Sequence, residues 1–280
     1  MTTPHREEPG KSQTTVLIAT SAGTGLRYFF QTGIISSLAK SGVSVVGLVP
    51  NPNDVKSDLA ELPQSFLLDA IHVGNHNNNL GWLMSRVNIV VEATIQYLRM
   101  AGVSRKINRA VFRDIQKYQD CRWRGSKIWP LLPIWRLTAA LLQRSRGARR
   151  IYHRLVHSRT TGFLQGDPFG KHQPSLVVTN GPGWADAEEI VIKEARARGI
   201  PSVAVLTGWD HTISQGLPLA LPDRIRTWSE VQKRELVDGC DVPPNSIDVG
   251  GVASFDSYHD PKRSLSKKNY FGKIGLDETR

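Results

Sequence analysis

Short apolar runs alternate with helical patterns near the start of the chain. The first run, Thr15–Thr20, is rich in β-forming residues and is typical of a strand buried on both faces. A loop, Ser21–Gly25, and a helical pattern over Leu26–Lys40 come next, and Val43–Val49 indicates a second strand. This order of strand, loop, helix and strand predicts a βαβ unit at the beginning of the fold.

The same alternation resumes in the second half of the chain. Two helical patterns there, Asp186–Arg198 and Glu230–Asp238, separate apolar runs of strand length. Together with the first half, this rhythm predicts an α/β fold, a Rossmann-like doubly wound parallel sheet over residues 15–257. The other strands that we expect are Ser65–Val73, Ser175–Thr179, Pro201–Thr207, Arg224–Trp228 and Ser246–Val249.

Between residues 80 and 158 the strand patterns stop and the apolar spacing becomes helical. Helices are expected over Leu83–Met100, Ile107–Tyr118 and Leu137–Val156, with a Pro-broken aromatic turn at Trp129–Trp135. We therefore expect a basic helical insertion within the sheet domain. The expected ends of the chain are a disordered leader, 1–14, and a linker towards a second domain, 258–280.

Composition narrows the class of protein only a little. Of the 280 residues, 40% are hydrophobic and 22% charged, as in ordinary globular proteins, which excludes wholesale disorder and a collagen-like fibre. The two cysteines, Cys121 and Cys240, are too few for a disulfide scaffold and fit a reducing compartment. The polar start has no apolar signal region, and no run approaches about 18 apolar residues. We therefore expect a cytoplasmic protein, soluble or peripheral at the inner face of the membrane.

The net charge is unevenly distributed along the chain. There are 36 Lys and Arg against 25 Asp and Glu, a net charge of +11. The segment Arg99–Arg159 holds sixteen basic and two acidic residues, or +14, so the rest of the chain, with 20 basic and 23 acidic residues, carries −3. This localised charge predicts a surface that faces an anion.

Tryptophans accompany the basic residues of the expected insertion. Amphipathic aromatic rings favour the lipid interface and Arg binds phosphates there, so an anionic membrane surface is the first interpretation. An ordinary solvated helical face and RNA binding through stacking are the alternatives, with nucleic acid the least favoured partner. The residues expected at a membrane or acceptor surface are Trp123, Trp129, Trp135, Arg144 and Arg149.

The loops that follow the strands are expected to carry the ligand site, because doubly wound sheets bind ligands at the carboxyl ends of their strands. Gly23-Thr24-Gly25 begins like a dinucleotide fingerprint, but Tyr28 stands where the third glycine is required. A nicotinamide cofactor is therefore disfavoured. We expect instead that a substrate approaches the following helix past Gly23, Thr24, Gly25 and Arg27. No Gly-Lys-Ser/Thr follows a strand, which excludes a P-loop.

A later loop places an aromatic ring, a carboxylate and an imidazole side by side at Trp209-Asp210-His211. An Asp beside a His holds the ring tautomer or acts as a general base, although the same residues also suit a capped turn with a stacked Trp. Asp186 is a second base candidate, or an acid that only complements its helix dipole. Further substrate-binding candidates are Gly183 and Trp184, and a metal site at His72 or His76 is not expected.

Three segments together resemble a known family. They are Gly208–Gly216 (GWDHTISQG), Pro222–Ser229 (PDRIRTWS) and Val249–Asp256 (VGGVASFD). The set resembles the N-terminal domain of GT-B glycosyltransferases, and most closely the surface-polysaccharide group that includes CDP-glycerol glycerophosphotransferase-like proteins. The similarity to the non-hydrolysing sugar-nucleotide epimerases is weaker, because Ser21–Gly25 lacks their Gly-Thr-Arg-Pro start.

The resemblance implies two facing Rossmann-like domains, the first binding the acceptor and the second a nucleotide-activated donor. Residues 267–280 resemble the lead-in to the second domain. We therefore expect the acceptor side alone, as a truncated gene product or as half of a split enzyme with a separate donor-binding subunit. The implied reaction, in cell-envelope polysaccharide biosynthesis, uses no cofactor or metal. An acceptor hydroxyl attacks the donor while Asp210, His211 or Asp186 accepts its proton.

Two function classes stay open. The first is the acceptor-side half of a GT-B glycosyltransferase or glycerophosphotransferase that acts on a membrane-associated glycan or lipid-linked acceptor. The second is a non-catalytic domain that binds an anionic membrane or a partner subunit. A third and weaker class, RNA binding through Arg99–Arg159, predicts steep salt dependence and no preference for lipid.

Overall fold

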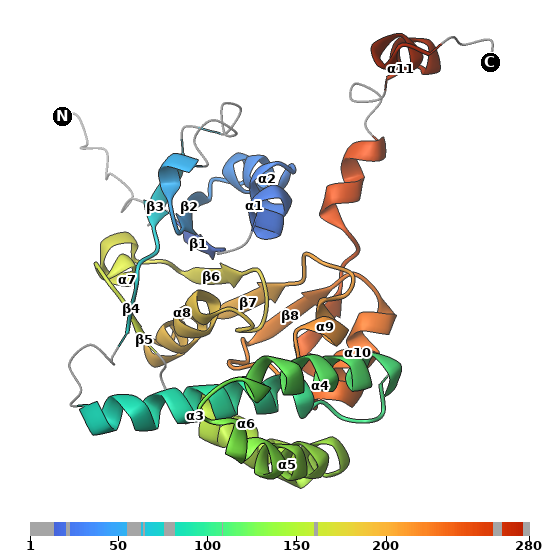
Figure 1. Ribbon diagram of the computed structural model, residues 1–280. Coiled ribbons are helices and arrows are strands. Elements are labelled where there is room, and N and C mark those ends of the chain that lie inside the picture. The colour runs from blue at the N-terminus through green and yellow to red at the C-terminus, as the bar shows by residue number, and fades with distance from the viewer. Residues whose placement is uncertain are drawn as a thin grey trace, which may run out of the picture.

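The computed structural model describes residues 14–20, 23–54, 63, 65–75, 82–107, 109–159, 162–259 and 265–276. Its centre is a seven-stranded sheet in which all neighbours run parallel, in the order β3-β2-β1-β6-β7-β8-β9 (Figure 1). The expected α/β fold with a Rossmann-like doubly wound sheet is confirmed. The strands are β1 (Thr15–Ala19), β2 (Ser44–Val49), β3 (Phe66–Ala70), β6 (Leu176–Thr179), β7 (Ser202–Val205), β8 (Arg224–Thr227) and β9 (Ile247–Val249).

Strand β1 shows how the sheet is buried on both faces. Its side chains alternate, so that Val16 and Ile18 pack into one apolar cluster while Leu17 and Ala19 pack into another on the opposite face. Both sets are buried, which explains why the strand is a continuous apolar run. The helices of the first cluster are α1 (Gly23–Phe30) and α2 (Ile34–Lys40), and those of the second are α7 (Pro168–His172) and α8 (Asp186–Ala197).

The single helix predicted over Leu26–Lys40 is wrong, because the chain turns between α1 and α2. The Thr32 hydroxyl donates a hydrogen bond to the Tyr28 carbonyl (2.7 Å) and accepts one from the Ile34 N–H (3.5 Å). Such a side chain competes with the backbone ladder of a continuous helix. The apolar spacing continues across this turn and therefore conceals it.

The helical insertion lies in the crossover between β3 and β6. It departs and returns through a two-stranded antiparallel ribbon, β4 (Val73–Asn75) with β5 (Gly162–Leu164), which the sequence pattern did not predict. The single helix expected over Leu137–Val156 is also wrong. Ser145 has an extended backbone, and its side chain accepts a hydrogen bond from the Ala148 N–H (3.2 Å), which starts a new helix. The helices are α3 (Trp82–Ala101), α4 (Arg109–Arg124), α5 (Leu132–Arg144) and α6 (Arg146–Ser158).

The insertion shares one apolar core with the second half of the sheet. Tyr97 of α3 is fully buried, and its ring centroid lies 5.3 Å from that of Trp135 of α5. The same core contains Leu206, which follows β7, and Ile225 of β8. The Tyr97 hydroxyl donates a hydrogen bond to Asp120 of α4 (2.9 Å). The insertion is therefore built into the domain, and its helices help to position the loops of the sheet.

In the last part of the chain, one helix follows β7, another follows β8, and β9 completes the sheet. A 3-10 segment, Ala253–His259, follows β9, and α11 lies apart from the sheet (Figure 1). Among the residues described, no helix is long and apolar enough to cross a membrane. The helices are α9 (His211–Ser214), α10 (Glu230–Cys240) and α11 (Lys267–Ile274).

Candidate functional site

Three loops meet at the point where the strand order reverses, between β1 and β6. Gly25 lies so close to Thr20 and Asn180 that a Cβ atom would overlap both side chains. The Thr207 hydroxyl, which follows β7, donates a hydrogen bond to the Asn180 side chain. Only glycine allows this approach at position 25. The loops after β1, β6 and β7 are therefore held together at the switch point, where sheets of this class bind ligands.

A pocket of about 180 Å³ opens at this point, and Glu188 is its buried carboxyl group. Glu188 is the third residue of α8 and accepts hydrogen bonds from the backbone N–H groups of Ala185 and Trp184. Burial raises its pKa from 4.5 to about 7, although these N–H groups and the charge of Arg99 favour the ionised form. The pocket is lined by Thr24, Asn180, Trp184, Ala185, Glu188, His211 and Gln215.

His211 faces the same pocket from the first residue of α9. Its imidazole packs over Gly208, where a Cβ atom would overlap the ring, and its centroid lies 5.9 Å from the Trp184 ring in an edge-on arrangement. Burial lowers the pKa of His211, and the charge of Asp210 opposes this shift. Nδ1 is buried and has no hydrogen-bond partner among the described residues. His211 is therefore neutral at pH 7, with one ring nitrogen left unpaired among the described residues.

Gln232 of α10 fixes the loop that carries His211. Its Nε2 donates hydrogen bonds to the carbonyls of Gly208 (2.9 Å) and Trp209 (3.1 Å), and its Oε1 accepts one from the Trp228 N–H (2.8 Å). Gln232 is buried, so these bonds are shielded from water. The loop is thus preorganised by the neighbouring helix.

The helical insertion supports the site from behind its lining residues, through Arg99 near the end of α3. Arg99 donates a hydrogen bond to the Trp184 carbonyl, and its own carbonyl accepts one from the Leu217 N–H (2.9 Å). The Trp184 indole donates a hydrogen bond to the Gly216 carbonyl (3.2 Å). A Cβ atom at Gly216 would lie 2.5 Å from the Arg99 carbonyl, so the close contact requires glycine. The insertion therefore supports the loop after β6.

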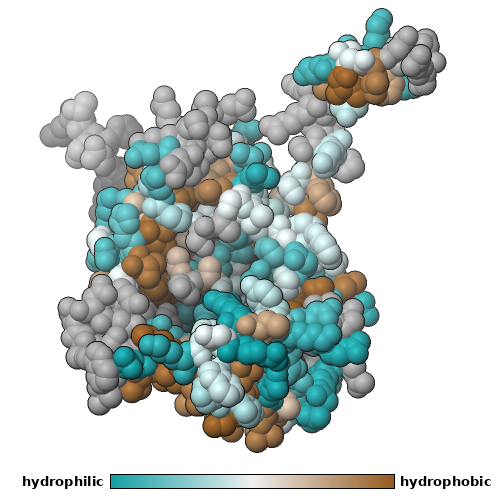
Figure 2. Space-filling view, viewed as in Figure 1, coloured by the Kyte–Doolittle hydropathy of each residue, from teal (hydrophilic) through white to brown (hydrophobic). Residues whose placement is uncertain are grey.

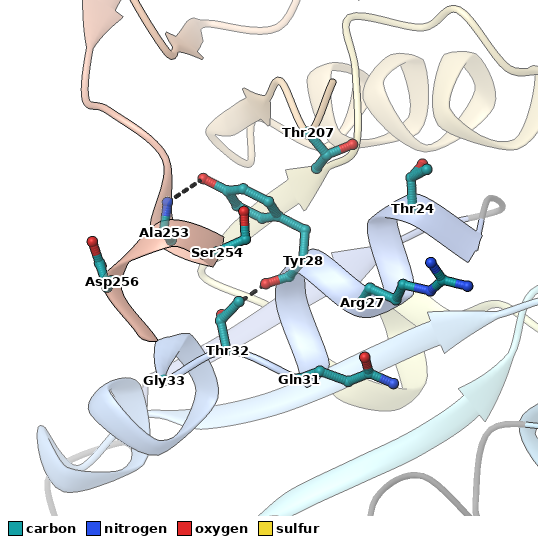
Figure 3. Close-up of a pocket in the computed structure, with 10 residues that line it drawn as sticks. All are labelled: Thr24, Arg27, Tyr28, Gln31, Thr32, Gly33, Thr207, Ala253, Ser254 and Asp256. Atoms are coloured by element: carbon teal, nitrogen blue, oxygen red, sulfur yellow. Dashed lines mark hydrogen bonds between the residues drawn. The ribbon is translucent and has the colours of Figure 1, made fainter. Parts of the chain in front are cut away.

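A second pocket of about 540 Å³ (Figure 3) shares the lining residue Thr24 with the switch-point pocket, and we refer to the two neighbouring pockets together as the groove. The Tyr28 ring stands inside it, and the Tyr28 hydroxyl accepts a hydrogen bond from the Ala253 N–H (3.2 Å). Arg27 extends away from Ala253 (Figure 3). The lining residues are Thr24, Arg27, Tyr28, Gln31, Thr32, Gly33, Thr207, Ala253, Ser254 and Asp256.

Four of the residues predicted from the sequence gather in the groove. Thr24, Trp184 and His211 line the switch-point pocket, and Arg27 lines the larger one. Gly25 lies at the contact between the loops that follow β1 and β6. The structure thus brings together residues from three of the loops that we expected to meet.

Other predicted site residues lie elsewhere. Trp209 is exposed, and Asp210 is half-buried and lines neither pocket. Asp186 is the first residue of α8, and its side chain lies outside the described part of the chain. Gly23 has open space where a Cβ would be, whereas Gly183 has a φ of +67° and packs against the Ala220 backbone. Gly183 therefore shapes its loop, and it lines neither pocket.

Two residues predicted at a membrane or acceptor surface are inside the protein. Trp135 packs in the core of the insertion and donates a hydrogen bond to Thr94 (3.0 Å). Arg149 is buried and forms an ion pair with Asp241 (2.7 Å). The composition of the segment could not reveal which of its side chains are covered. Of the other three, Trp123 is half-buried against Trp135, and Trp129 and Arg144 are exposed.

Glu188 is the main residue that the sequence reasoning missed. A Glu three residues after a helix cap is a sequence signal for a side chain that turns back towards the helix start, so the signal was present at Ala185–Glu188. Asn180 and Arg99 were missed because their roles come from packing between distant segments. No group of three or more His, Cys, Asp or Glu side chains is placed to hold a metal within the described ranges; His76 lies outside them.

Comparison with protein-family models gives no match, and comparison with curated proteins gives none either. Among solved structures, the chain is similar to UDP-N-acetylglucosamine 2-epimerase from Rickettsia bellii, with a TM-score of 0.45 and 12% sequence identity. The similarity covers 95% of this chain and 52% of that one. The chain thus spans about half the length of that structure.

Proposed function

We propose that the chain is the acceptor-side domain of a GT-B-type glycosyltransferase or glycerophosphotransferase. The observation that carries the proposal is Glu188, a buried carboxyl group with a pKa of about 7 that lines the switch-point pocket with His211. Such a carboxyl group exchanges a proton readily near neutral pH, which activation of a hydroxyl nucleophile requires. The motif resemblance within residues 208–256 supports group transfer as the reaction class.

In the proposed reaction, the acceptor hydroxyl lies in the switch-point pocket. Its oxygen forms a bond to the anomeric carbon of a sugar donor, or to the phosphorus of a glycerophosphoryl donor. The hydroxyl proton passes to the Glu188 carboxylate. The bond from the attacked atom to the nucleotide phosphate oxygen breaks, and its electron pair leaves with the nucleotide. Neutral His211 holds the acceptor oxygen by a hydrogen bond.

The acid–base candidates differ in whether their side chains line a pocket. Glu188 lines the pocket and is buried, whereas Asp210 lines neither pocket. The charge of Asp210 only partly opposes the lowering of the His211 pKa by burial, and we assign Asp210 no direct part in the proton transfer. Replacement of Glu188 by Gln then reduces turnover by about 10²- to 10⁴-fold, as the loss of a general base does. Replacement of Asp210 by Asn has a smaller effect.

The rest of the groove suits a substrate of moderate size. The larger pocket, at about 540 Å³, falls within the range of small-molecule sites and is rimmed by hydroxyl groups. We propose that it holds the remainder of a glycan or lipid-linked acceptor, with Thr24 and Arg27 at its edge. The nucleotide-activated donor then comes from a second domain or a separate donor-binding subunit.

A second candidate function is a non-catalytic domain that binds an anionic membrane or a partner subunit. The exposed apolar side chains of α5 and α6 favour it, because the proposed reaction does not use them. The two functions predict different behaviour of the groove. A purely binding domain gains no stability from acceptor fragments.

Thermal unfolding of the purified chain tests the proposed function. Soluble acceptor fragments, such as short glycans and glycerol phosphate oligomers, are compared with nucleotides, nucleotide sugars and CDP-glycerol. A fragment at about a hundredfold excess over its Kd adds about 2.7 kcal/mol of stability. The variant Thr24→Trp places a large ring at the residue that lines both pockets and should abolish the shift. Ser37→Trp adds the same ring on the exposed face of α2, outside both pockets, and should keep it.

Two results would overturn the assignment. Stabilisation by a nucleotide alone, lost in Thr24→Trp, would make the groove a donor site. No stabilisation by any acceptor fragment would leave the groove without its proposed ligand. Stabilisation by a fragment in wild type and Ser37→Trp, but not in Thr24→Trp, supports the proposal.

A further inference from the structure

Helix α5 is apolar on two opposite faces, and only one of them is covered. Trp135, Ala139 and Leu142 pack into the core. On the other side, Leu137 and Leu141 are one turn apart and point into solvent, together with Ile134 one turn earlier. A helix that is apolar all round is normally buried on all sides. The outer face of α5 therefore lacks a partner within the described part of the chain.

Helix α6, which contacts α5, also carries exposed apolar side chains. Ile151 and Leu155 lie one turn apart and are exposed, and Arg150 and Arg154 form a parallel row beside them. The two helices contact each other at the lower end of the molecule, where apolar side chains gather in the space-filling view (Figures 1 and 2). The α5–α6 face is defined by Trp129, Ile134, Leu137, Leu141, Ile151 and Leu155, each exposed by 57% to 74%.

The surroundings of the α5–α6 face are positively charged. Residues 121–166 contain ten Lys and Arg and no Asp or Glu. Arg136, Arg146 and Arg149 pair with acids from other segments. The exposed residues Arg144, Arg150 and Arg154 have no ion pair among the described residues. Apolar side chains bordered by unneutralised arginines are the composition of a helix that lies in a membrane interface.

We propose that the α5–α6 face docks on the surface of an anionic lipid bilayer. Its apolar side chains enter the boundary between head groups and acyl chains, and Arg144, Arg150 and Arg154 bind lipid phosphates. Docking itself does not depend on Glu188 or the groove. It rests on the proposed function only in naming the bilayer as the place where the acceptor is presented.

Charge and polarity favour this occupant over two others. A second copy of the chain would bring two acid-free, arginine-rich segments together, and their repulsion opposes self-association through this face. A nucleic acid would pair with the arginines but leave six apolar side chains in water. An anionic bilayer covers the apolar residues and neutralises the arginines at once.

Vesicle flotation of the full chain tests the docking surface. Vesicles of phosphatidylcholine alone are compared with vesicles that also contain phosphatidylglycerol. The double variant Leu137→Gln/Leu141→Gln should weaken binding to the anionic vesicles by about 100-fold, roughly tenfold for each leucine withdrawn from the interface. Arg150→Gln/Arg154→Gln should weaken it by about 25-fold, and added salt should weaken wild-type binding. A control, Leu67→Gln/Val231→Gln, replaces two apolar residues elsewhere that are also about half exposed or more, and should bind as wild type does.

Three outcomes would overturn the proposal. The first is equal binding by wild type and Leu137→Gln/Leu141→Gln. The second is sedimentation of wild type as a dimer that this variant loses, without vesicle binding, which would assign the face to a second copy. The third is tighter binding to duplex RNA than to anionic vesicles. Glu188→Gln should bind vesicles normally, so a failure of the catalytic assignment leaves a distinct result from a failure of docking.

Discussion

Two regions of the molecule depart from the usual rule that polar groups are exposed and apolar groups are buried. The groove at the carboxyl edge of the sheet buries a carboxyl group, and the α5–α6 face exposes apolar side chains. In the groove, the carboxyl group of Glu188 is buried, and burial raises its pKa to about 7. On the α5–α6 face, Leu137 and its neighbours are apolar and stay in contact with water. Burial of the ionisable carboxyl group costs stability near neutral pH, whereas the exposed apolar side chains add none, and neither arrangement is needed to complete the core. Such local departures are expected where a protein binds or reacts.

The two regions are joined by the insertion. Helix α3 packs against α5 on one side, and near its end Arg99 binds the Trp184 carbonyl beside the groove. If the two regions are energetically separate, a change in one region leaves the behaviour of the other unaltered. Each variant described below alters one region, and the variants are ordered from the largest expected effect to the smallest.

The largest effect is expected from Glu188→Gln on turnover, a loss of about 10²- to 10⁴-fold. The amide keeps the size of the side chain but accepts no proton. Turnover of wild type should rise with pH through about 7, because the carboxylate is the active form, and the variant should lose this rise. Steady-state rates across pH measure both. Asp210→Asn with the larger loss would move the base to Asp210.

The next effect compares two adjacent leucines of α5. Leu142 is 3% exposed, and its replacement by Ala should cost about 2–5 kcal/mol of unfolding free energy through lost burial and a cavity. Leu141 is exposed, and its replacement by Gln should change stability by no more than about 0.5 kcal/mol. Urea unfolding measures both. Equal losses would show that the outer face of α5 is covered in the folded protein.

A smaller effect is expected on the pH dependence of stability. Below pH 4.5, Glu188 is protonated in the folded and unfolded chain alike. Between pH 4.5 and about 7, the unfolded chain releases a proton that the folded chain keeps, so stability through this group falls as pH rises, by up to about 3 kcal/mol. Glu188→Gln removes this decline.

His157 also changes the stability of the protein with pH, so the contribution of Glu188 has to be measured as a difference from the Glu188→Gln variant. Burial lowers the pKa of His157 from 6.5 to about 4, so the unfolded chain gains a proton that the folded chain refuses as pH falls through this range. Its contribution to stability therefore falls towards acid, opposite to that of Glu188. The difference between wild type and Glu188→Gln, measured by urea unfolding at pH 5 and pH 8, isolates the carboxyl group. Parallel curves would contradict the raised pKa.

The smallest effect concerns the loop that holds His211. Gln232→Leu leaves the carbonyls of Gly208 and Trp209 without their donor and should cost about 1–3 kcal/mol. Because the loop then loses its fixed position, ligand-induced stabilisation should fall as well. Vesicle binding should be unchanged. A loss of vesicle binding in this variant would show that the two regions are coupled.

The sheet could be predicted because its strands are short apolar runs between loops, and the order of elements defines the fold class. The turn at Thr32 and the break at Ser145 could not, because each depends on a single side-chain hydrogen bond within a continuous helical pattern. The ribbon of β4 and β5 could not be predicted from the sequence, because each strand has only three residues and the two strands pair across the whole insertion.

The candidate site was predictable in its loops but not in its chemistry. The glycine-rich loop and His211 could be found because strand ends in such sheets converge. The capping pattern at Ala185–Glu188 indicates a side chain that turns back to the start of its helix, but the burial of Glu188 beside the switch point depends on how the loops pack in the folded chain. Trp135 and Arg149 were predicted at a surface because of their residue types, but both are buried by packing in the folded protein.

The most direct test of the account is a carbon-13 NMR titration of the Glu188 carboxyl group, assigned by its absence in Glu188→Gln. The account predicts an apparent pKa of about 7, because the carboxyl group is buried at the switch point. It also predicts that an acceptor fragment in the groove shifts this resonance. A pKa near 4.5, unaffected by any fragment, would show that Glu188 only caps its helix and would contradict its assignment as the base.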